Sequence, residues 1–121
     1  ETDPAVAVKL YNIARSDKND VITEIFKSKA VLVGSSTINR GILYEVGGLL
    51  EMIKGLGFKN KKAAGFGSYG WSGESVKIIT ETLKASGFAV VNDGIREAWN
   101  PDQGAIDNCV AFGNDFAAVV R

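Results

Sequence analysis

Two kinds of apolar segment alternate along this chain, and the alternation restricts its fold more than any other feature. Short runs of β-branched and apolar residues predict strands at 5–13, 30–33, 62–66 and 88–91. Apolar residues at helical spacing predict helices that begin at Asp20, cover 43–56, begin at Glu74 and follow Pro101. Strands separated by helices pair in parallel through right-handed crossovers. We therefore expect an α/β fold, with an open parallel sheet and helices on both faces.

The length of the chain, 121 residues, allows one hydrophobic core but not two. We expect residues 1–121 to form a single domain, with residues 1–4 as a ragged N-terminal start. The 14 basic and 14 acidic residues cancel, and the sequence shows no basic stripe or acidic tail. This balance argues against nucleic acids and anionic membranes as partners.

The sequence is poor in metal ligands, because histidine is absent and Cys109 is the only cysteine. It therefore offers no cluster for zinc or iron and no pair for an internal disulfide. The longest apolar runs, such as 88–91, are far too short to cross a bilayer, and the N-terminus does not resemble a secretory signal. We expect a cytoplasmic protein without a bound metal.

Two loops carry the strongest signs of a binding site. Ala63 to Ser75, A-A-G-F-G-S-Y-G-W-S-G-E-S, runs from an apolar strand through glycines, serines and aromatic residues into a helix. Val31 to Asn39, V-L-V-G-S-S-T-I-N, follows the same plan. Because parallel strands end along a common edge, where open α/β sheets bind ligands, we expect the loops to lie together. Their glycines allow close backbone approach, and Tyr69 and Trp71 supply flat apolar faces for a flat ligand.

Both loops also fit two alternative interpretations. Either loop alone is compatible with an ordinary connection between a strand and a helix. Gly65, Gly67 and Gly70 also spell the G-x-G-x-x-G pattern of dinucleotide sites, and Asp93 follows near the end of the next strand. In that pattern the third glycine lies within the helix, whereas here the predicted helix begins at Glu74. The position of Gly70 thus argues against NAD as the ligand.

The wider context of both loops resembles a known family. The segments V-L-V-G-S-S-T-I-N-R-G-I-L and A-A-G-F-G-S-Y-G-W-S-G-E-S are similar to the FMN-binding flavodoxin-like domain of flavodiiron proteins, also called A-type flavoproteins. The segment K-L-Y-N-I-A-R-S-D-K-N-D-V-I-T-E-I resembles the second strand of that domain and the helix after it. The likeness extends over most of the chain, from about Val6 to Phe116.

The resemblance implies that the cofactor is FMN, with its isoalloxazine ring between the two loops. One side of the ring would be bordered, mainly through backbone contacts, by Ser35, Ser36, Thr37, Ile38 and Asn39. The other side would be bordered by Ser68, Tyr69, Gly70, Trp71, Ser72 and Gly73. No residue of this chain is expected to be catalytic, because the chemistry belongs to the flavin.

This sequence departs from the family pattern at its beginning. Family domains start with an extra strand, a phosphate-binding loop and a helix, whereas this chain starts at what would be the second strand, so we expect it to be N-terminally truncated. In the family's strand order the missing strand is central, which predicts a vacancy between 5–13 and 30–33. We expect uncovered apolar surface, a homo-oligomer or a chain cut from a longer protein, and weakened FMN binding. Backbone amides at 72–75 are the remaining candidates for the phosphate.

The resemblance also implies a function. The chain is expected to be the electron-transfer domain of a flavodiiron-type oxygen or nitric oxide reductase. Its electron donor would be a redox protein such as rubredoxin. Its acceptor would be a diiron lactamase-like domain, in cis or in trans, since this chain holds no complete active site. A flavin-free flavodoxin-like module for assembly or regulation stays open as the alternative.

Overall fold

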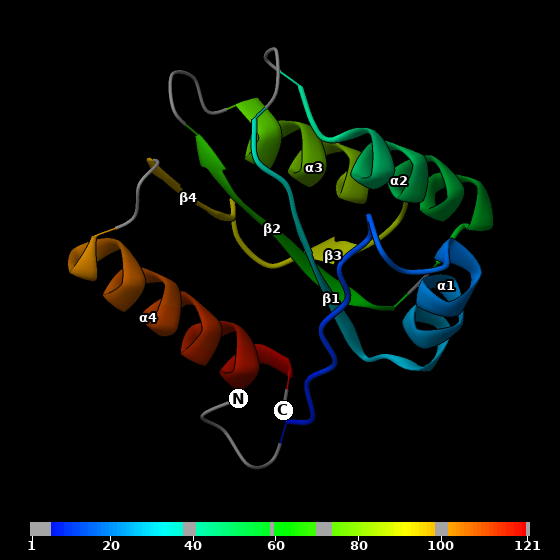
Figure 1. Cartoon of the computed structure of the whole chain (residues 1–121). Helices are drawn as coiled ribbons and strands as arrows, with labels where there is room; N and C mark the ends of the chain where they lie inside the picture. The colour runs from blue at the N-terminus through cyan, green and yellow to red at the C-terminus, as the bar shows by residue number, and fades with distance from the viewer. Residues whose placement is uncertain (1–5, 38–40, 59, 70–73, 99–101, 121) are drawn as a thin grey trace.

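The computed structural model describes residues 6–37, 41–58, 60–69, 74–98 and 102–120. Its helices and strands follow one another as shown in Figure 1: α1 (Lys18–Lys27), β1 (Ala30–Gly34), α2 (Tyr44–Leu56), β2 (Lys62–Tyr69), α3 (Glu74–Ala85), β3 (Ala89–Val90), β4 (Ile95–Ala98) and α4 (Gln103–Val120). Strands and helices alternate over most of this order, as the sequence predicts.

The sheet is parallel and is built around β2. On one side β1 pairs with it from Ala30 opposite Lys62 to Gly34 opposite Phe66. On the other side β3 pairs with the first residues of β2 and β4 with its last residues. The expected open parallel α/β class is therefore confirmed.

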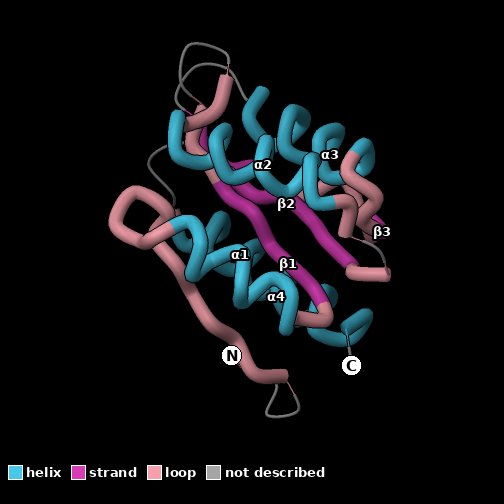
Figure 2. Tube along the Cα trace, turned by 90° about the vertical axis from the view of Figure 1, so that its right-hand side faces the viewer, coloured by secondary structure: helices cyan, strands magenta, loops and turns pink. Residues whose placement is uncertain are grey.

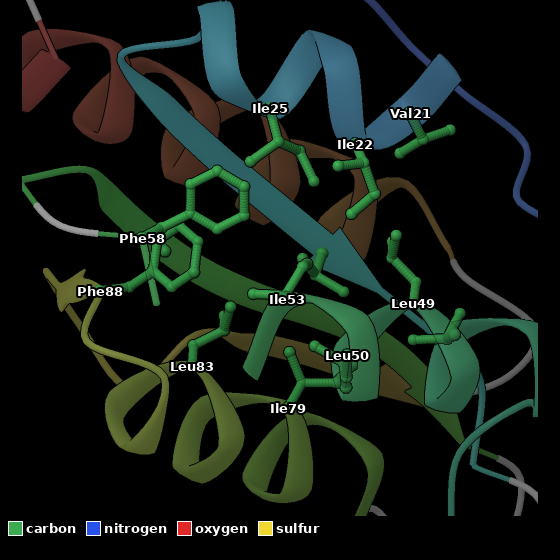
Figure 3. Close-up of a cluster of buried hydrophobic side chains, with 13 residues drawn as sticks. Val21, Ile22, Ile25, Leu49, Leu50, Ile53, Phe58, Ile79, Leu83 and Phe88 are labelled. Atoms are coloured by element: carbon green, nitrogen blue, oxygen red, sulfur yellow. The ribbon is translucent and has the colours of Figure 1, made fainter. Parts of the chain in front are cut away.

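The helices lie in two layers. Helices α2 and α3 lie on one face of the sheet and α4 lies on the other (Figures 1 and 2). Buried side chains of α1, α2, α3, β1 and β2 form one cluster on the first face, which includes Val21, Ile22, Ile25, Val33, Leu49, Leu50, Ile53, Ala63, Ile79 and Leu83 (Figure 3). Phe58 and Phe88, from the connections before β2 and β3, close its end. The core thus holds the helices of one layer against the strands whose loops form the candidate site.

The first predicted strand is wrong. Residues 7–12 have no regular secondary structure and residues 13–15 form a turn, although Tyr11 and Ile13 still pack against the core. A strand needs a neighbour for its backbone N–H and C=O groups, and no described strand lies on the outer edge of β1. Residues with strand character therefore run as an extended coil beside the sheet.

The structure also differs from the prediction at the start of α1 and after β3. Helix α1 begins at Lys18 with Asp17 as its N-cap, and not at Asp20, which lies in the first turn. The segment after β3, where the sequence predicts no strand, contains β4. Its inward-facing residues Ile95 and Glu97 are only half-buried, so the sequence has no apolar run that would predict this strand. Pro101, which precedes the predicted last helix, lies outside the described residues. Helix α4 is capped by the side chain of Asp102, whose Oδ1 accepts the Ala105 N–H at 2.8 Å.

Candidate functional site

The two loops that the sequence singles out leave the sheet side by side. The hydrogen-bond ladder between β1 and β2 continues beyond Gly34, because the Ser35 N–H donates to the Phe66 carbonyl at 3.1 Å. The Thr37 N–H then donates to the Ser68 carbonyl at 3.0 Å. The described parts of both loops, 35–37 and 68–69, therefore lie together at the carboxyl edge of the sheet, where α/β folds place their ligands.

Ser35 is a buried residue that shapes the first loop. Its side chain is only 6% exposed. Its hydroxyl donates to the Ser36 carbonyl at 2.8 Å and accepts the Leu43 N–H at 3.0 Å. Leu43 is the N-cap of α2, so this hydroxyl joins the loop to the start of the next helix. The hydroxyl of Ser35 and its backbone N–H and carbonyl are therefore all engaged within the protein.

A second hydroxyl group links the first loop to α3. The Thr37 hydroxyl donates to Ser75 Oγ at 3.0 Å, and the Ser75 hydroxyl donates to the Ser35 carbonyl at 3.0 Å. The Ser75 N–H in turn donates to Thr37 Oγ1 at 3.2 Å. The sequence assigns Ser75 no role in the ring site. The only sequence feature that points to Ser75 is its position, as a small polar residue in the first turn of a helix that follows a predicted binding loop.

These contacts change the expectation for the phosphate. The sequence suggests the backbone amides of residues 72–75 as donors for it. The Ser75 N–H is already used by Thr37 Oγ1, so this part of the prediction is wrong. The Ser75 amide is thus not among the donors left for a phosphate.

Tyr69 lies at the end of β2 and is half-buried. The guanidinium carbon of Arg96, on β4, is 5.8 Å from the centre of its ring, a distance typical of cation–π contacts. Tyr69 thus has a partner within the sheet. The predicted contacts Ile38, Asn39, Gly70, Trp71, Ser72 and Gly73 lie outside the described residues.

The glycines of β2 are accounted for by packing, without a dinucleotide. A Cβ atom on Gly65 would lie 3.1 Å from Ile79 Cγ2, so this glycine lets α3 pack closely on the strand. A Cβ atom on Gly67 would collide with the Ser35 carbonyl and would lie 2.8 Å from Ser75 Oγ. Helix α3 begins at Glu74, as predicted, which leaves Gly70 ahead of it. The packing therefore does not support a G-x-G-x-x-G dinucleotide site.

A cavity of about 170 Å³ adjoins the root of the first loop. It is lined by residues 11–14 on one side and by Gly34, Leu43, Glu45 and Val46 on the other. It lies at the end of β1, between the first segment and the start of α2. Among the described residues, no group of three His, Cys, Asp or Glu side chains could hold a metal ion. None of the described helices has the length and apolar character to cross a membrane.

Comparisons with known families and proteins identify the family of the chain. The family model of flavodoxin matches residues 2–113. The anaerobic nitric oxide reductase flavorubredoxin of Shigella dysenteriae is 47% identical over 117 residues, which are 97% of this chain and 24% of that protein. The flavorubredoxin of Escherichia coli O1:K1 is 46% identical over the same share. The chain thus spans about a quarter of the length of these curated relatives.

Solved structures show the same relationship. Rubredoxin oxygen:oxidoreductase from Desulfovibrio gigas matches with a TM-score of 0.91 and 34% identity, over 96% of this chain and 29% of that one. A flavodiiron core from Synechocystis matches with a TM-score of 0.87 and 28% identity, over 95% and 28%. A flavodoxin from the Archaea matches with a TM-score of 0.78 and 28% identity, over 89% and 73%. The resemblance to the flavodoxin-like domain of flavodiiron proteins is therefore confirmed.

Proposed function

Because the chain belongs to the flavodoxin family, whose cofactor is FMN, we propose that it binds FMN between the loops at the ends of β1 and β2. In this role it is the electron-transfer domain of a flavodiiron-type oxygen or nitric oxide reductase. The observation that carries the proposal is the Thr37 N–H to Ser68 carbonyl bond, which puts both ring-binding loops beside each other. The flavorubredoxins, at 46% and 47% identity, support the choice of reductase.

The described residues form the roots of the proposed FMN site. The hydroxyls of Ser35, Thr37 and Ser75 are engaged within the protein. The Ser35 N–H and carbonyl, the Thr37 N–H and the Ser68 carbonyl are engaged as well, so these bonds hold the loop roots and the ring would contact other groups of the two loops. FMN, when bound, supplies the electron-carrying chemistry, and this chain binds and orients it.

The names of relatives suggest the electron donor and the acceptor. Rubredoxin occurs in the names of the flavorubredoxins and of the Desulfovibrio gigas oxidoreductase, so we assign a rubredoxin-like protein as donor. We assign a diiron lactamase-like domain, in cis or in trans, as acceptor, because the chain contains no histidine to build such a centre itself. The exposed thiol of Cys109 suits a reducing cytoplasm, which we propose as the location.

We further propose that the chain self-associates. Leu32 and Phe66 are each 41% exposed on the face of the sheet that α4 covers incompletely. The outer edge of β1 has no strand beside it among the described elements. Association with a second copy would bury apolar surface at this face. The same surface keeps the alternative function open, a flavin-free module for assembly.

Titration with FMN and with riboflavin tests the proposed function. Riboflavin carries the same ring without the phosphate, so the pair separates the two halves of the ligand. We expect both to bind, with dissociation constants within about tenfold of each other, since a built phosphate site would add about 1.5–3 kcal/mol per charged contact.

Two results would contradict these expectations in different ways. If neither flavin binds and the purified chain is colourless, FMN is not its cofactor and the assembly module is favoured. If FMN binds with a submicromolar dissociation constant and riboflavin binds more than about a hundredfold more weakly, the chain does bind the flavin ring. The expectation that its phosphate binding is weakened is then wrong.

A further inference from the structure

Hydrogen bonds between the Thr37 and Ser75 hydroxyls and the Ser35 carbonyl join two segments that are far apart in sequence. Ser75 is 1% exposed and Ser35 is 6% exposed. Ser75 Oγ accepts a hydrogen bond from Thr37 and donates one to the Ser35 carbonyl, each at 3.0 Å. Water has little access to these groups and cannot replace a lost partner without rearrangement. The bonds therefore resist separation of the first loop from α3.

Thr37 also completes the first turn of α3. Ser75 is the second residue of that helix, so its N–H has no carbonyl acceptor within the helix. Thr37 Oγ1 accepts this N–H at 3.2 Å, although the two residues are 38 positions apart. The start of α3 is thus capped by a side chain from the loop after β1. If that loop moves, a buried amide and a buried hydroxyl both lose their partner.

The hydrogen bond between Ser75 Oγ and the Ser35 carbonyl lies against β2, at the start of the second loop. The Ser35 carbonyl and Ser75 Oγ both approach Gly67 so closely that a Cβ atom there would have no room. The next residue, Ser68, accepts the Thr37 N–H at 3.0 Å. One small buried region therefore fixes the first loop, the second loop and the helix that follows it relative to one another.

We propose that Thr37 and Ser75 are positioning residues, whose paired hydroxyls set the spacing of the two loops and so the width of the slot for the isoalloxazine ring. This inference rests on the proposed function, because the slot has a ligand only if FMN binds there. The two hydroxyls act through the loops that they hold and not by touching the ring.

The test compares Thr37→Val, which removes the hydroxyl, with Thr37→Ser, which keeps it. Ser75→Ala removes the other partner. Thr82→Val is the matched control, because the Thr82 hydroxyl donates only within α3, to the Ile78 carbonyl at 2.8 Å. For each variant of the full chain, the FMN dissociation constant is measured, together with the circular dichroism of the bound flavin's visible bands at saturating FMN. Amide hydrogen exchange of residues 35–37 and 68–69 is measured without flavin.

We expect Thr37→Val and Ser75→Ala to raise the FMN dissociation constant about tenfold, weaken the visible dichroism and speed exchange at the loop roots. Thr37→Ser should restore all of these, and Thr82→Val should leave them unchanged. A dichroism signal that stays at the wild-type level at saturation in both hydroxyl-free variants would overturn the positioning role.

Failure of the proposed function gives a different pattern. If the wild-type chain binds no FMN, the flavin slot is refuted together with its positioning residues, whatever the exchange data show. If the wild-type chain binds FMN and exchange at the loop roots is unchanged in Thr37→Val, only the positioning role is refuted.

Discussion

At the scale of single residues, the glycines around β2 are determined by what lies against them. Gly65 faces Ile79, and Gly67 faces the Ser35 carbonyl and Ser75 Oγ. Gly94, between β3 and β4, has a φ of 86° and passes close to the Gly65 carbonyl, which no larger residue would tolerate. These glycines therefore serve the packing of loops and helices on the central strand, and they make the close approach of the two binding loops sterically feasible.

Gly67→Ala is expected to destabilise the chain. The new methyl group would collide with the Ser35 carbonyl and would lie 2.8 Å from Ser75 Oγ. We expect a loss of about 1–3 kcal/mol in the free energy of unfolding, as for other overpacked sites, measured by urea denaturation. Gly113→Ala, in α4 with no atom near its Cβ position, should instead gain up to about 1 kcal/mol from helix propensity. Equal effects of the two substitutions would contradict the crowding at Gly67.

At the scale of elements, α1 shows how a helix start is chosen. Asp17 has an extended backbone, with φ −70° and ψ 125°, and its Oδ1 accepts the Asn19 N–H at 2.8 Å. Asp20 lies one turn further on, where its charge acts only on the positive end of the helix. The hydrogen bond places the cap at Asp17, three positions before the residue that the pattern favours.

Asp17→Ala and Asp20→Ala separate the two roles, since each removes one carboxylate near the same helix end. We expect Asp17→Ala to cost about 1 kcal/mol of unfolding free energy through the lost cap. Asp20→Ala should cost less, because only a charge–dipole interaction disappears. Urea midpoints of the two variants provide the comparison, and a larger loss for Asp20→Ala would restore the sequence-based start.

Elements whose apolar residues recur at a regular spacing were predictable from the sequence. Elements that depend on pairing with a neighbouring strand were not. The helix predicted over 43–56 is α2, Tyr44–Leu56, because Val46, Leu49, Leu50 and Ile53 recur at the spacing of one buried face. Segment 5–13 has the composition of a strand but no described neighbour to pair with, so the strand predicted from its composition does not form. Strand β4 pairs with β2 without an apolar run of its own.

The candidate site was predictable to a similar degree. The meeting of 35–37 with 68–69 follows from the rule that parallel strands end at one edge. The role of Ser75 does not follow, because its partners Thr37 and Ser35 lie 38 and 40 positions away. A serine in the first turn of a helix has no sequence feature that identifies such distant partners.

At the scale of the whole molecule, the two faces of the sheet are covered unequally. Residues in register point to the same face, so Leu32 and Ala64 share one face with Gly34 and Phe66. The buried Val33 and Ala63 belong to the other face, under α2 and α3. On the first face α4 buries Phe116 and Ala105, while Leu32 and Phe66 stay partly exposed. This imbalance underlies the proposed self-association.

Leu32→Glu is expected to weaken self-association without unfolding the chain, since Leu32 is already 41% exposed. Loss of one buried leucine contact should raise the dissociation constant of the oligomer about tenfold or more. Sedimentation velocity over a range of concentrations measures the effect. Leu56→Glu, at a residue 47% exposed at the end of α2, is the control and should leave association unchanged. A wild-type chain that sediments as a monomer throughout would refute the homo-oligomer.

Strand β2 takes part in every strand pairing that the structure describes, with β1, β3 and β4. The Lys62 side chain, at its start, also donates to the Val119 carbonyl near the end of α4 at 2.6 Å. No two of its neighbours pair with each other among the described strands. If β2 leaves the sheet, all of the described strand pairings are therefore lost. Such a sheet melts as one cooperative unit, and the amides of β2 should exchange with solvent only through global unfolding.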